Sequence, residues 1–135
     1  MNVTYHDQTD RLDWEAVRQA LISDDFHNGR TTNQLRQSFE NSLIRSFAID
    51  EETCIGTARA LSDGVGNAYV VDVWTQSSHR GHGIGKAMMH RLLAEGPGQH
   101  FYLQTDADTV TFYEELGFKA QPAGMSLVQG GYLRG

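Results

Sequence analysis

Cysteine and proline are scarce in this chain. Cys54 is the only cysteine among 135 residues, which excludes a disulfide within the chain and suits a reducing compartment. No motif places a histidine to activate it, so we interpret Cys54 as a buried strand residue rather than a nucleophile. No segment has the length and apolarity of a membrane span or a signal peptide. We therefore expect a cytoplasmic protein with no membrane partner.

Positive charge is also in short supply. The chain has 11 Lys and Arg against 17 Asp and Glu, a formal net charge of −6, which argues against a broad face for DNA or RNA. The same charge would attract a cationic acceptor, although many soluble domains are equally acidic. The 6 histidines show neither H-E-x-x-H nor a Cys/His ligand spacing. We expect no nucleic-acid partner and no bound metal.

The hydrophobic pattern indicates an alternating α/β order in one compact domain. With 39% hydrophobic residues the chain can form a packed core, and no linker or repeat divides it. The run 68–75 is nearly continuous in apolar residues, which is typical of a central strand covered on both faces. Strands are expected at residues 2–6, 44–49, 53–61, 68–75, 100–104, 118–120 and 125–128, the last two as a closing hairpin.

Helices are expected between these strands, where apolar residues recur at helical spacing. Residues 26–33 are polar and contain a glycine, so they are expected to form a loop between the first two helices. The first three expected helices lie at residues 12–22, 35–43 and 84–93, and the third stops at Gly96, Pro97 and Gly98. A fourth helix is expected around Tyr113, with Asp106 or Asp108 as its N-terminal cap and Gly117 at its end.

A run of alternating glycines stands between the strand-like segment 68–75 and the helical segment that follows it. Glycine lets the backbone pass close to a ligand, and the first turn of a helix offers unpaired N–H groups to an anion. The pattern therefore predicts a phosphate-binding loop, made of Arg80, Gly81, His82, Gly83, Ile84, Gly85 and Lys86.

Two common phosphate-binding loops do not fit this run. A P-loop ending in Gly85 and Lys86 would need a glycine at the position of Arg80 and a serine or threonine at that of Ala87. A dinucleotide-binding fingerprint that starts at Gly81 would need a third glycine at position 86, which is lysine. Both of these classes are excluded.

Another pattern does fit, and a second motif supports it. Arg80, Gly83 and Gly85 resemble the acyl-coenzyme-A pyrophosphate loop of the GNAT (GCN5-related N-acetyltransferase) superfamily, and residues 112–118, F-Y-E-E-L-G-F, resemble its F-Y-x-x-L-G-F element. The resemblance implies a single GNAT domain over residues 1–135. It implies an α/β (α+β) fold with a mixed, mostly antiparallel sheet of six to seven strands, a splayed parallel pair at its middle and about four flanking helices.

The resemblance also implies an acetyl-CoA-dependent N-acetyltransferase, with acetyl-CoA as the acyl donor. The pantetheine arm would pair with the backbone of the strand before the loop, and many GNAT sequences have an asparagine where this chain has Asp106. Besides the loop 80–86, the implied coenzyme-binding residues are Val73, Trp74, Thr75, Asp106 and Phe112.

Direct attack of an amine on the thioester needs an acid for the leaving thiolate and a base for the amine. By resemblance, Tyr113 is the acid, because a phenol keeps its proton at neutral pH. Asp72, on the strand that leads to the loop, is our first candidate for the base, with Asp106 and His100 as alternatives. The structural interpretation of Asp72 is an acid held in a buried strand by an arginine such as Arg59.

The acceptor is less well marked than the donor. We expect it to be a small-molecule amine or amino-acid derivative, with a protein lysine or N-terminus as the other candidate. The first two helices and their loop are where GNAT proteins usually build part of the acceptor pocket. A non-catalytic acyl-CoA sensor or protein-interaction module is the alternative from another class. A homodimer is also expected, because dimers are common in this superfamily.

Overall fold

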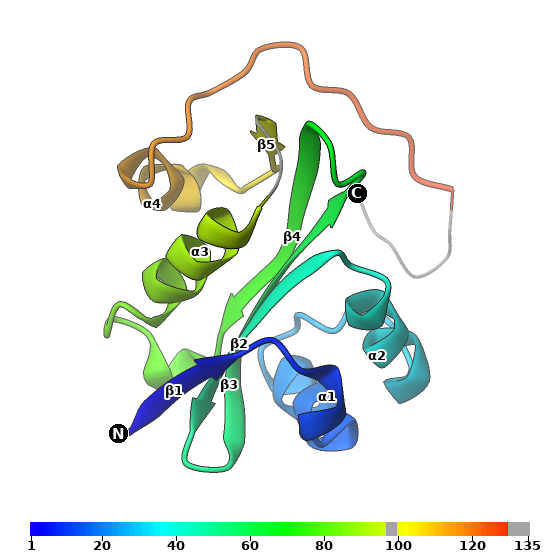
Figure 1. The fold of residues 1–135 in the computed structure, drawn as a ribbon, viewed down its shortest axis with the longest axis vertical. Coiled ribbons are helices and arrows are strands. Elements are labelled where there is room, and N and C mark those ends of the chain that lie inside the picture. The colour runs from blue at the N-terminus through cyan, green and yellow to red at the C-terminus, as the bar shows by residue number, and fades with distance from the viewer. Residues whose placement is uncertain (97–99, 130–135) are drawn as a thin grey trace.

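The computed structural model describes residues 1–96 and 100–129, which form a five-stranded mixed sheet in the order β1-β2-β3-β4-β5 (Figure 1). Neighbouring strands from β1 to β4 are antiparallel, whereas β4 and β5 are parallel. The strands are β1 (Val3–His6), β2 (Ile44–Asp50), β3 (Thr53–Ser62), β4 (Asn67–Thr75) and β5 (His100–Tyr102).

Four α-helices flank the sheet, with α1 and α2 on one side and α3 and α4 on the other (Figure 1). Asp13 caps α1 by accepting a hydrogen bond from the amide of Ala16 at 3.1 Å. Thr31 and Gln34 form a capping box at α2, which satisfies two otherwise unpaired donors. The helices are α1 (Trp14–Ser23), α2 (Thr32–Glu40), α3 (Ile84–Glu95) and α4 (Val110–Glu115), with short 3₁₀ turns η1 (Thr9–Arg11), η2 (Ser77–His79) and η3 (Ala107–Thr109).

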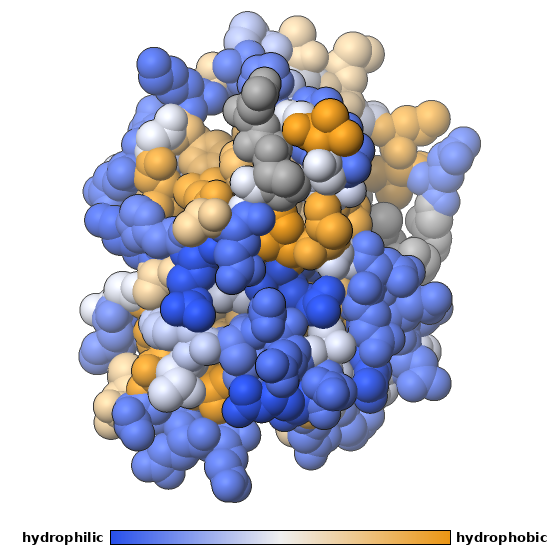
Figure 2. Space-filling model, in the orientation of Figure 1, coloured by the Kyte–Doolittle hydropathy of each residue, from blue (hydrophilic) through white to orange (hydrophobic). Residues whose placement is uncertain are grey.

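Each face of the sheet carries its own hydrophobic cluster. On the α3 side, small strand residues leave room for the helix, and the fully buried Met88, Met89 and Leu92 fill it. On the other side, Phe47 of β2 packs against Trp14 and Phe39 with ring centroids 5.9 and 5.4 Å away. Figure 2 shows that the outer surface over α1 and α2 is mostly hydrophilic, as expected for amphipathic helices that bury one stripe.

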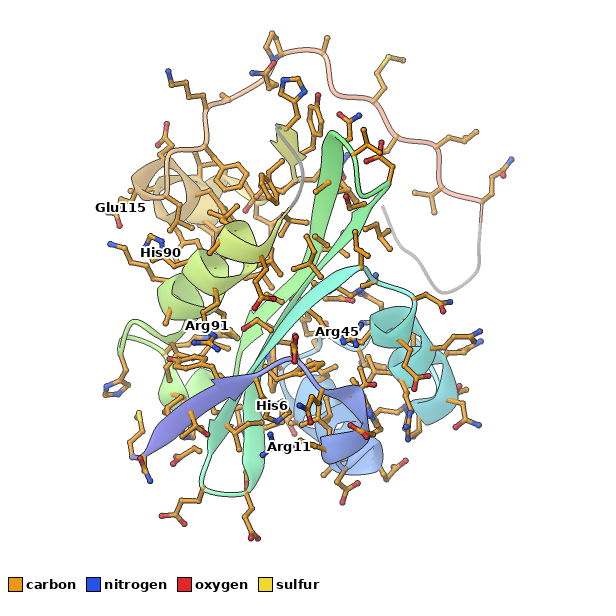
Figure 3. The ribbon with its side chains drawn as sticks, in the orientation of Figure 1. His6, Arg11, Arg45, His90, Arg91 and Glu115 are labelled. Atoms are coloured by element: carbon orange, nitrogen blue, oxygen red, sulfur yellow. The ribbon has the colours of Figure 1, made fainter. Side chains whose placement is uncertain are left out.

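Helix α3 also reaches the first strand of the sheet. Arg91 projects from α3 toward β1 (Figure 3), and its guanidinium carbon lies 5.5 Å from the centroid of the Tyr5 ring. A cation over an aromatic face adds about 0.5–1 kcal/mol at an exposed site. The helix that follows the glycine loop is thus held across most of the sheet, which fixes the position of the loop itself.

Strand β4 contains a β-bulge in its second half. Thr57 of β3 pairs with Trp74 and Arg59 pairs with Val71, so two residues of β4 oppose one residue of β3. Asp72, one of these two, has a positive φ of 55°, and its carbonyl accepts a hydrogen bond from the Thr57 hydroxyl at 2.8 Å. A bulge bends its strand, and this bend lies where β4 and β5 part.

The parallel pair is short. The pairing of β4 with β5 covers only Asn67 to Tyr69 against His100 to Tyr102, whereas β4 continues to Thr75. The segment after β5 therefore diverges from β4, which confirms the predicted splayed parallel pair. In the described residues this pair lies at one edge of the sheet and not at its middle.

The strand count was predicted slightly too high. Residues 118–120 and 125–128 are not strands in the structure, which leaves five strands instead of six to seven. Residues 122 and 123 do form a turn, and Ala123 has a positive φ of 66°, but the segments on either side of this turn form no strand pairing. Leu127 is instead exposed.

Helix boundaries moved by a few residues. The second helix begins at Thr32 and not near Leu35, because the Thr31 cap fixes its start. Neither Asp106 nor Asp108 caps a helix through its side chain in the described structure. Gly117 does have the expected positive φ, at 99°. Pro97 and Gly98 lie outside the described residues. Among the described helices, none is long and apolar enough to cross a membrane.

Candidate active site

A cavity of about 820 Å³ opens where β4 and the segment after β5 part. Its walls come from the second half of β4, the glycine loop, the segment after β5 and helix α4, with one residue from the loop between α1 and α2. The lining residues are Phe26, Val70–Thr75, His79, Arg80, Gly81, Gly83–Lys86, Leu103–Asp106, Thr109, Phe112 and Tyr113.

The glycine loop lines this cavity and has the conformation expected of an anion-binding loop. Gly81 and Gly83 have positive φ angles of 83° and 76°, which side-chain-bearing residues rarely adopt. Gly83 is the N-cap of α3, whose first amides have no partner within the helix. The loop and the helix N-terminus together favour a negatively charged group such as a pyrophosphate.

Two cations flank the loop. Arg80 and Lys86 both line the cavity. The Nε of Arg80 donates to the Thr75 carbonyl at 3.0 Å, which fixes the stem of the guanidinium while 59% of the side chain stays exposed. His82 was also predicted to bind the coenzyme, but its exposed side chain is not part of the cavity lining.

The two sequence motifs meet inside the cavity. A Cβ added to Gly85 would lie 3.4 Å from the ring of Phe112 and 3.4 Å from the Thr75 hydroxyl oxygen. The rings of Phe112 and Tyr113 are edge-to-face, with centroids 4.9 Å apart. Phe112 therefore lies beside Gly85, and Tyr113, the next residue of α4, is held close to the glycine loop.

Tyr113 lines the cavity from helix α4, next to Phe112. Its ring is held by Phe112 and, edge-to-face at 5.8 Å, by Phe118, whose amide donates to the Tyr113 carbonyl at 3.1 Å. Burial raises the pKa of the Tyr113 phenol above its ordinary value, because the phenolate is the form that burial disfavours. The hydroxyl therefore keeps its proton at neutral pH.

Asp72 faces the same cavity, but its carboxylate is already engaged. Arg30 donates to both of its oxygens, at 2.8 and 3.1 Å, and the Nε of Arg59 donates to one of them at 2.7 Å. Burial alone would raise the pKa of Asp72, but the hydrogen bonds and charges of Arg30 and Arg59 outweigh it and lower the pKa. Such a group is a weak proton acceptor, and the geometry favours the structural interpretation of Asp72.

The other two candidate bases lie in different places. His100 borders a separate cavity of about 470 Å³ and is absent from the lining of the larger one. Asp106 is exposed and lines the larger cavity. Its carboxylate has no salt-bridge partner among the residues that the structure describes. Asp106 is therefore the carboxylate of this cavity that is open to a ligand.

Sequence reasoning missed several lining residues. Phe26 is the one member from the loop between α1 and α2, and an aromatic side chain inside a polar loop was the available signal. His79 was not placed at the site either, although it immediately precedes the loop; its Nε2 lies 2.8 Å from Asp50. The remaining missed residues are Val70, Val71, Leu103, Gln104, Thr105 and Thr109.

The model of the "Acetyltransferase (GNAT) family" matches residues 7–118 of this sequence. That span includes both motifs and every residue that lines the cavity. The chain therefore belongs to the GNAT acetyltransferase family.

Curated relatives carry acetyltransferase names. The chain is 38% identical over 78 residues to "GCN5-related N-acetyltransferase 2, chloroplastic" of Arabidopsis thaliana, across 56% of this chain and 30% of the relative. It is 36% identical over 100 residues to "Serotonin N-acetyltransferase 2, chloroplastic" of Oryza sativa subsp. japonica, across 69% of this chain and 50% of the relative. This chain thus spans from about a third to half the length of these relatives.

Solved structures share the fold over nearly the whole chain. A protein assigned to the GNAT family, from Xanthomonas campestris pv. campestris, has a TM-score of 0.81 at 23% identity and covers 98% of this chain and 97% of its own. A predicted acetyltransferase from Clostridium acetobutylicum, solved with acetyl-CoA, has a TM-score of 0.69 at 18% identity and covers 94% and 95%. At these identities the likeness establishes the fold.

Proposed function

We propose that this protein transfers the acetyl group of acetyl-CoA to a primary amine by direct attack, with Tyr113 as the general acid. The supporting observation is that the glycine loop and Tyr113, from motifs about 30 residues apart, line one cavity between the splayed strands. The phosphate end of acetyl-CoA fits the loop, Arg80 and Lys86. Its pantetheine arm fits the backbone of β4 from Val73 to Thr75, where β5 no longer pairs with that strand.

The reaction begins when the lone pair of a neutral amine attacks the thioester carbonyl carbon. A C–N bond forms, the carbonyl oxygen becomes an oxyanion, and a backbone N–H of β4 near Val73 stabilises it. The C–S bond then breaks, and the departing thiolate takes the proton of the Tyr113 hydroxyl. The amine proton finally returns Tyr113 to its phenol form, so no net proton is gained or lost by the enzyme.

An acceptor that arrives as an ammonium ion must lose one proton before its lone pair can attack, in addition to the proton that returns to Tyr113. Because two arginines hold the carboxylate of Asp72, we assign Asp72 to the positioning of β4 and not to this step. We propose that the proton leaves through the exposed Asp106 or through water beside it, since that carboxylate lines the cavity. The prediction that Asp106 binds the coenzyme is then a competing role for the same residue.

We propose a small amine as the acceptor. The relative from rice is named for serotonin, an amine with an aromatic ring, and Phe26 places an aromatic side chain in the cavity wall of this protein. Another relative, from Glycine max, is named "Histone acetyltransferase TAP1" and is 37% identical over 79 residues, across 56% of this chain and 34% of the relative, which keeps a protein lysine as the second candidate.

An assay of thiol release from acetyl-CoA tests the function without a known acceptor. The screen would include serotonin, other arylalkylamines, polyamines, amino acids and a lysine-rich histone peptide. We expect turnover with at least one small amine and loss of that turnover in Tyr113→Phe. Turnover with the peptide alone would move the protein acceptor to first place. Saturable binding of acetyl-CoA with no turnover on any amine would favour the non-catalytic sensor.

A further inference from the structure

One carboxylate oxygen connects the acceptor side of the cavity to the coenzyme side. Asp24 is the C-cap of α1, and its side chain is only 9% exposed. The Oδ2 atom accepts hydrogen bonds from the Trp74 indole N–H at 2.9 Å and the Ser77 amide at 3.0 Å. The same oxygen lies 3.7 Å from an Arg80 guanidinium nitrogen. The two hydrogen bonds span 50 and 53 residues of sequence.

The three groups that approach Asp24 all belong to the path of the coenzyme. Trp74 is on the part of β4 proposed to pair with pantetheine, and its side chain is 2% exposed. Ser77 begins η2, the turn between that strand and the glycine loop. Arg80 begins the loop and is anchored by its second contact, to the Thr75 carbonyl. A displacement of Asp24 would therefore move all three.

Asp24 also begins the loop between α1 and α2, residues 24–31, which we call the acceptor loop. A second tie holds the other end of this loop, because Arg30 pairs with Asp72 of β4 at 2.8 Å. Phe26, the residue of this loop that lines the cavity, stands between the two ties. Both ties go to the same stretch of β4, so the position of Phe26 depends on the strand that borders the coenzyme.

We propose that Asp24 is a positioning residue that couples the acceptor loop to coenzyme binding, by fixing that loop on β4 and by orienting Arg80. The inference rests on the proposed function for its coenzyme, and Asp24 itself contacts no reacting atom. Acetyl-CoA that engages Arg80 and β4 would stabilise the acceptor loop through this carboxylate. The amine site is then completed when the coenzyme is bound.

The ionisation state of Asp24 fits this role. Burial alone would raise the pKa of Asp24, but the hydrogen bonds from Trp74 and Ser77 and the charge of Arg80 outweigh it and lower the pKa. The group is therefore a carboxylate at neutral pH, and its charge faces Arg80. Because most of the Arg80 side chain is exposed, its remaining donors are available for a phosphate.

Two substitutions of Asp24 separate the effect of its negative charge from the effect of its hydrogen-bond acceptor. Asp24→Asn keeps an oxygen acceptor for Trp74 and Ser77 but removes the charge, whereas Asp24→Ala removes both. Asp25→Asn is the matched control, because Asp25 is the neighbouring residue, is exposed, and has a positive φ of 54° that asparagine tolerates.

Calorimetric titration with acetyl-CoA is the first measurement on these variants. We expect the dissociation constant to rise about 10-fold in Asp24→Ala, equivalent to about 1.4 kcal/mol, and less in Asp24→Asn. Asp25→Asn should bind like the wild type. If the wild type itself showed no binding, the proposed function would fail. If the wild type bound but the Asp24 variants matched Asp25→Asn, the positioning role alone would fail.

Hydrogen exchange tests the coupling itself, which a merely structural role for Asp24 would not produce. The Phe26 amide donates to the Leu21 carbonyl at 2.8 Å, so its exchange rate reports on the acceptor loop. In the wild type, saturating acetyl-CoA should slow this exchange severalfold. In folded Asp24→Asn the slowing should shrink, and equal slowing in both proteins would overturn the coupling.

Discussion

Phe112 lies directly over Gly85, so closely that a Cβ on the glycine would be 3.4 Å from the aromatic ring. The two residues come from the two sequence motifs, so this contact joins the glycine loop to helix α4. Gly85 has no positive φ, so its role is to provide space and not an unusual backbone angle.

A series at position 85 should therefore depend on side-chain size. Gly85→Ala should fold and bind acetyl-CoA almost normally, because 3.4 Å is an ordinary carbon contact and alanine favours a helix by up to about 1 kcal/mol. Gly85→Leu should displace Phe112, lower the free energy of unfolding by about 1–3 kcal/mol and weaken coenzyme binding. Thermal melts and calorimetry check both variants. Equal behaviour of the two would show that the contact is unimportant.

Tyr113→Phe should separate binding from chemistry. Only the hydroxyl is lost, so the ring contacts with Phe112 and Phe118 and the affinity for acetyl-CoA should persist. Turnover with the best amine from the screen should fall by about 10²–10⁴, the usual contribution of a positioned acid. Phe118→Leu is a control that disturbs the same cluster while it keeps the hydroxyl.

The pH dependence of turnover should reflect the raised pKa of the Tyr113 phenol. Because burial raises the pKa of Tyr113, its acid form is retained up to its ordinary value of about 10 and beyond. The wild-type rate should therefore show no loss from Tyr113 ionisation between pH 7 and 9. A fall in kcat in that range that disappears in Tyr113→Phe would contradict the raised pKa.

Asp72→Asn should destabilise the fold strongly. It leaves Arg30 and Arg59 without their buried counter-charge, which costs about 3–5 kcal/mol of unfolding free energy. Asparagine tolerates the positive φ of this position, so the loss reports on charge. Glu40→Gln, at the exposed pair with Arg36, is the control and should cost about 0.5 kcal/mol or less.

Acid should remove the stabilisation that Asp72 provides. The pKa of Asp72 is lower in the folded state than its ordinary value of 3.8, so the contribution is complete above that value and is lost as pH falls below it. Wild-type stability should therefore drop more steeply below pH 4 than that of Asp72→Asn. Parallel acid profiles for the two proteins would mean that Asp72 does not titrate in this way.

Cys54 should be chemically silent in the folded protein. Its side chain is buried in β3, and burial raises the pKa of the thiol to about 12. A thiol reagent at pH 8 should react slowly with the native protein and should titrate one equivalent of thiol once the protein is unfolded. The variant Cys54→Ser should keep the turnover of the wild type. Rapid native modification that abolishes turnover would place the cysteine at the site.

The glycine loop and the aromatic pair of α4 were predictable from sequence because each depends on local signals. Glycines at a strand-to-helix junction and an aromatic pair before L-G-F determine backbone geometry within a few residues, and the structure brings these motifs together. The hairpin of β2 and β3 followed from alternation and an acidic turn in the same way. A homodimer and a cytoplasmic location stay predictions.

The features that could not be predicted from sequence depend on contacts between residues far apart in the chain. Arg30 reaches Asp72 across 42 residues and Trp74 reaches Asp24 across 50, so neither pair is visible in spacing. The bulge at Asp72, which aims its carboxylate at two arginines, follows from the register between β3 and β4. The closing hairpin was overpredicted because residues 118–120 and 125–128 have a β-prone composition but, in the described part of the chain, no strand that pairs with them.

Calorimetric titration with acetyl-CoA tests the central claim most directly, because it needs no knowledge of the acceptor. The wild type should bind one equivalent saturably. Gly83→Asp should bind far more weakly, since it places a side chain and a negative charge at a positive-φ position of the phosphate loop, while Gly66→Ala, in open space, should bind normally. No binding by the wild type at millimolar acetyl-CoA would contradict the account.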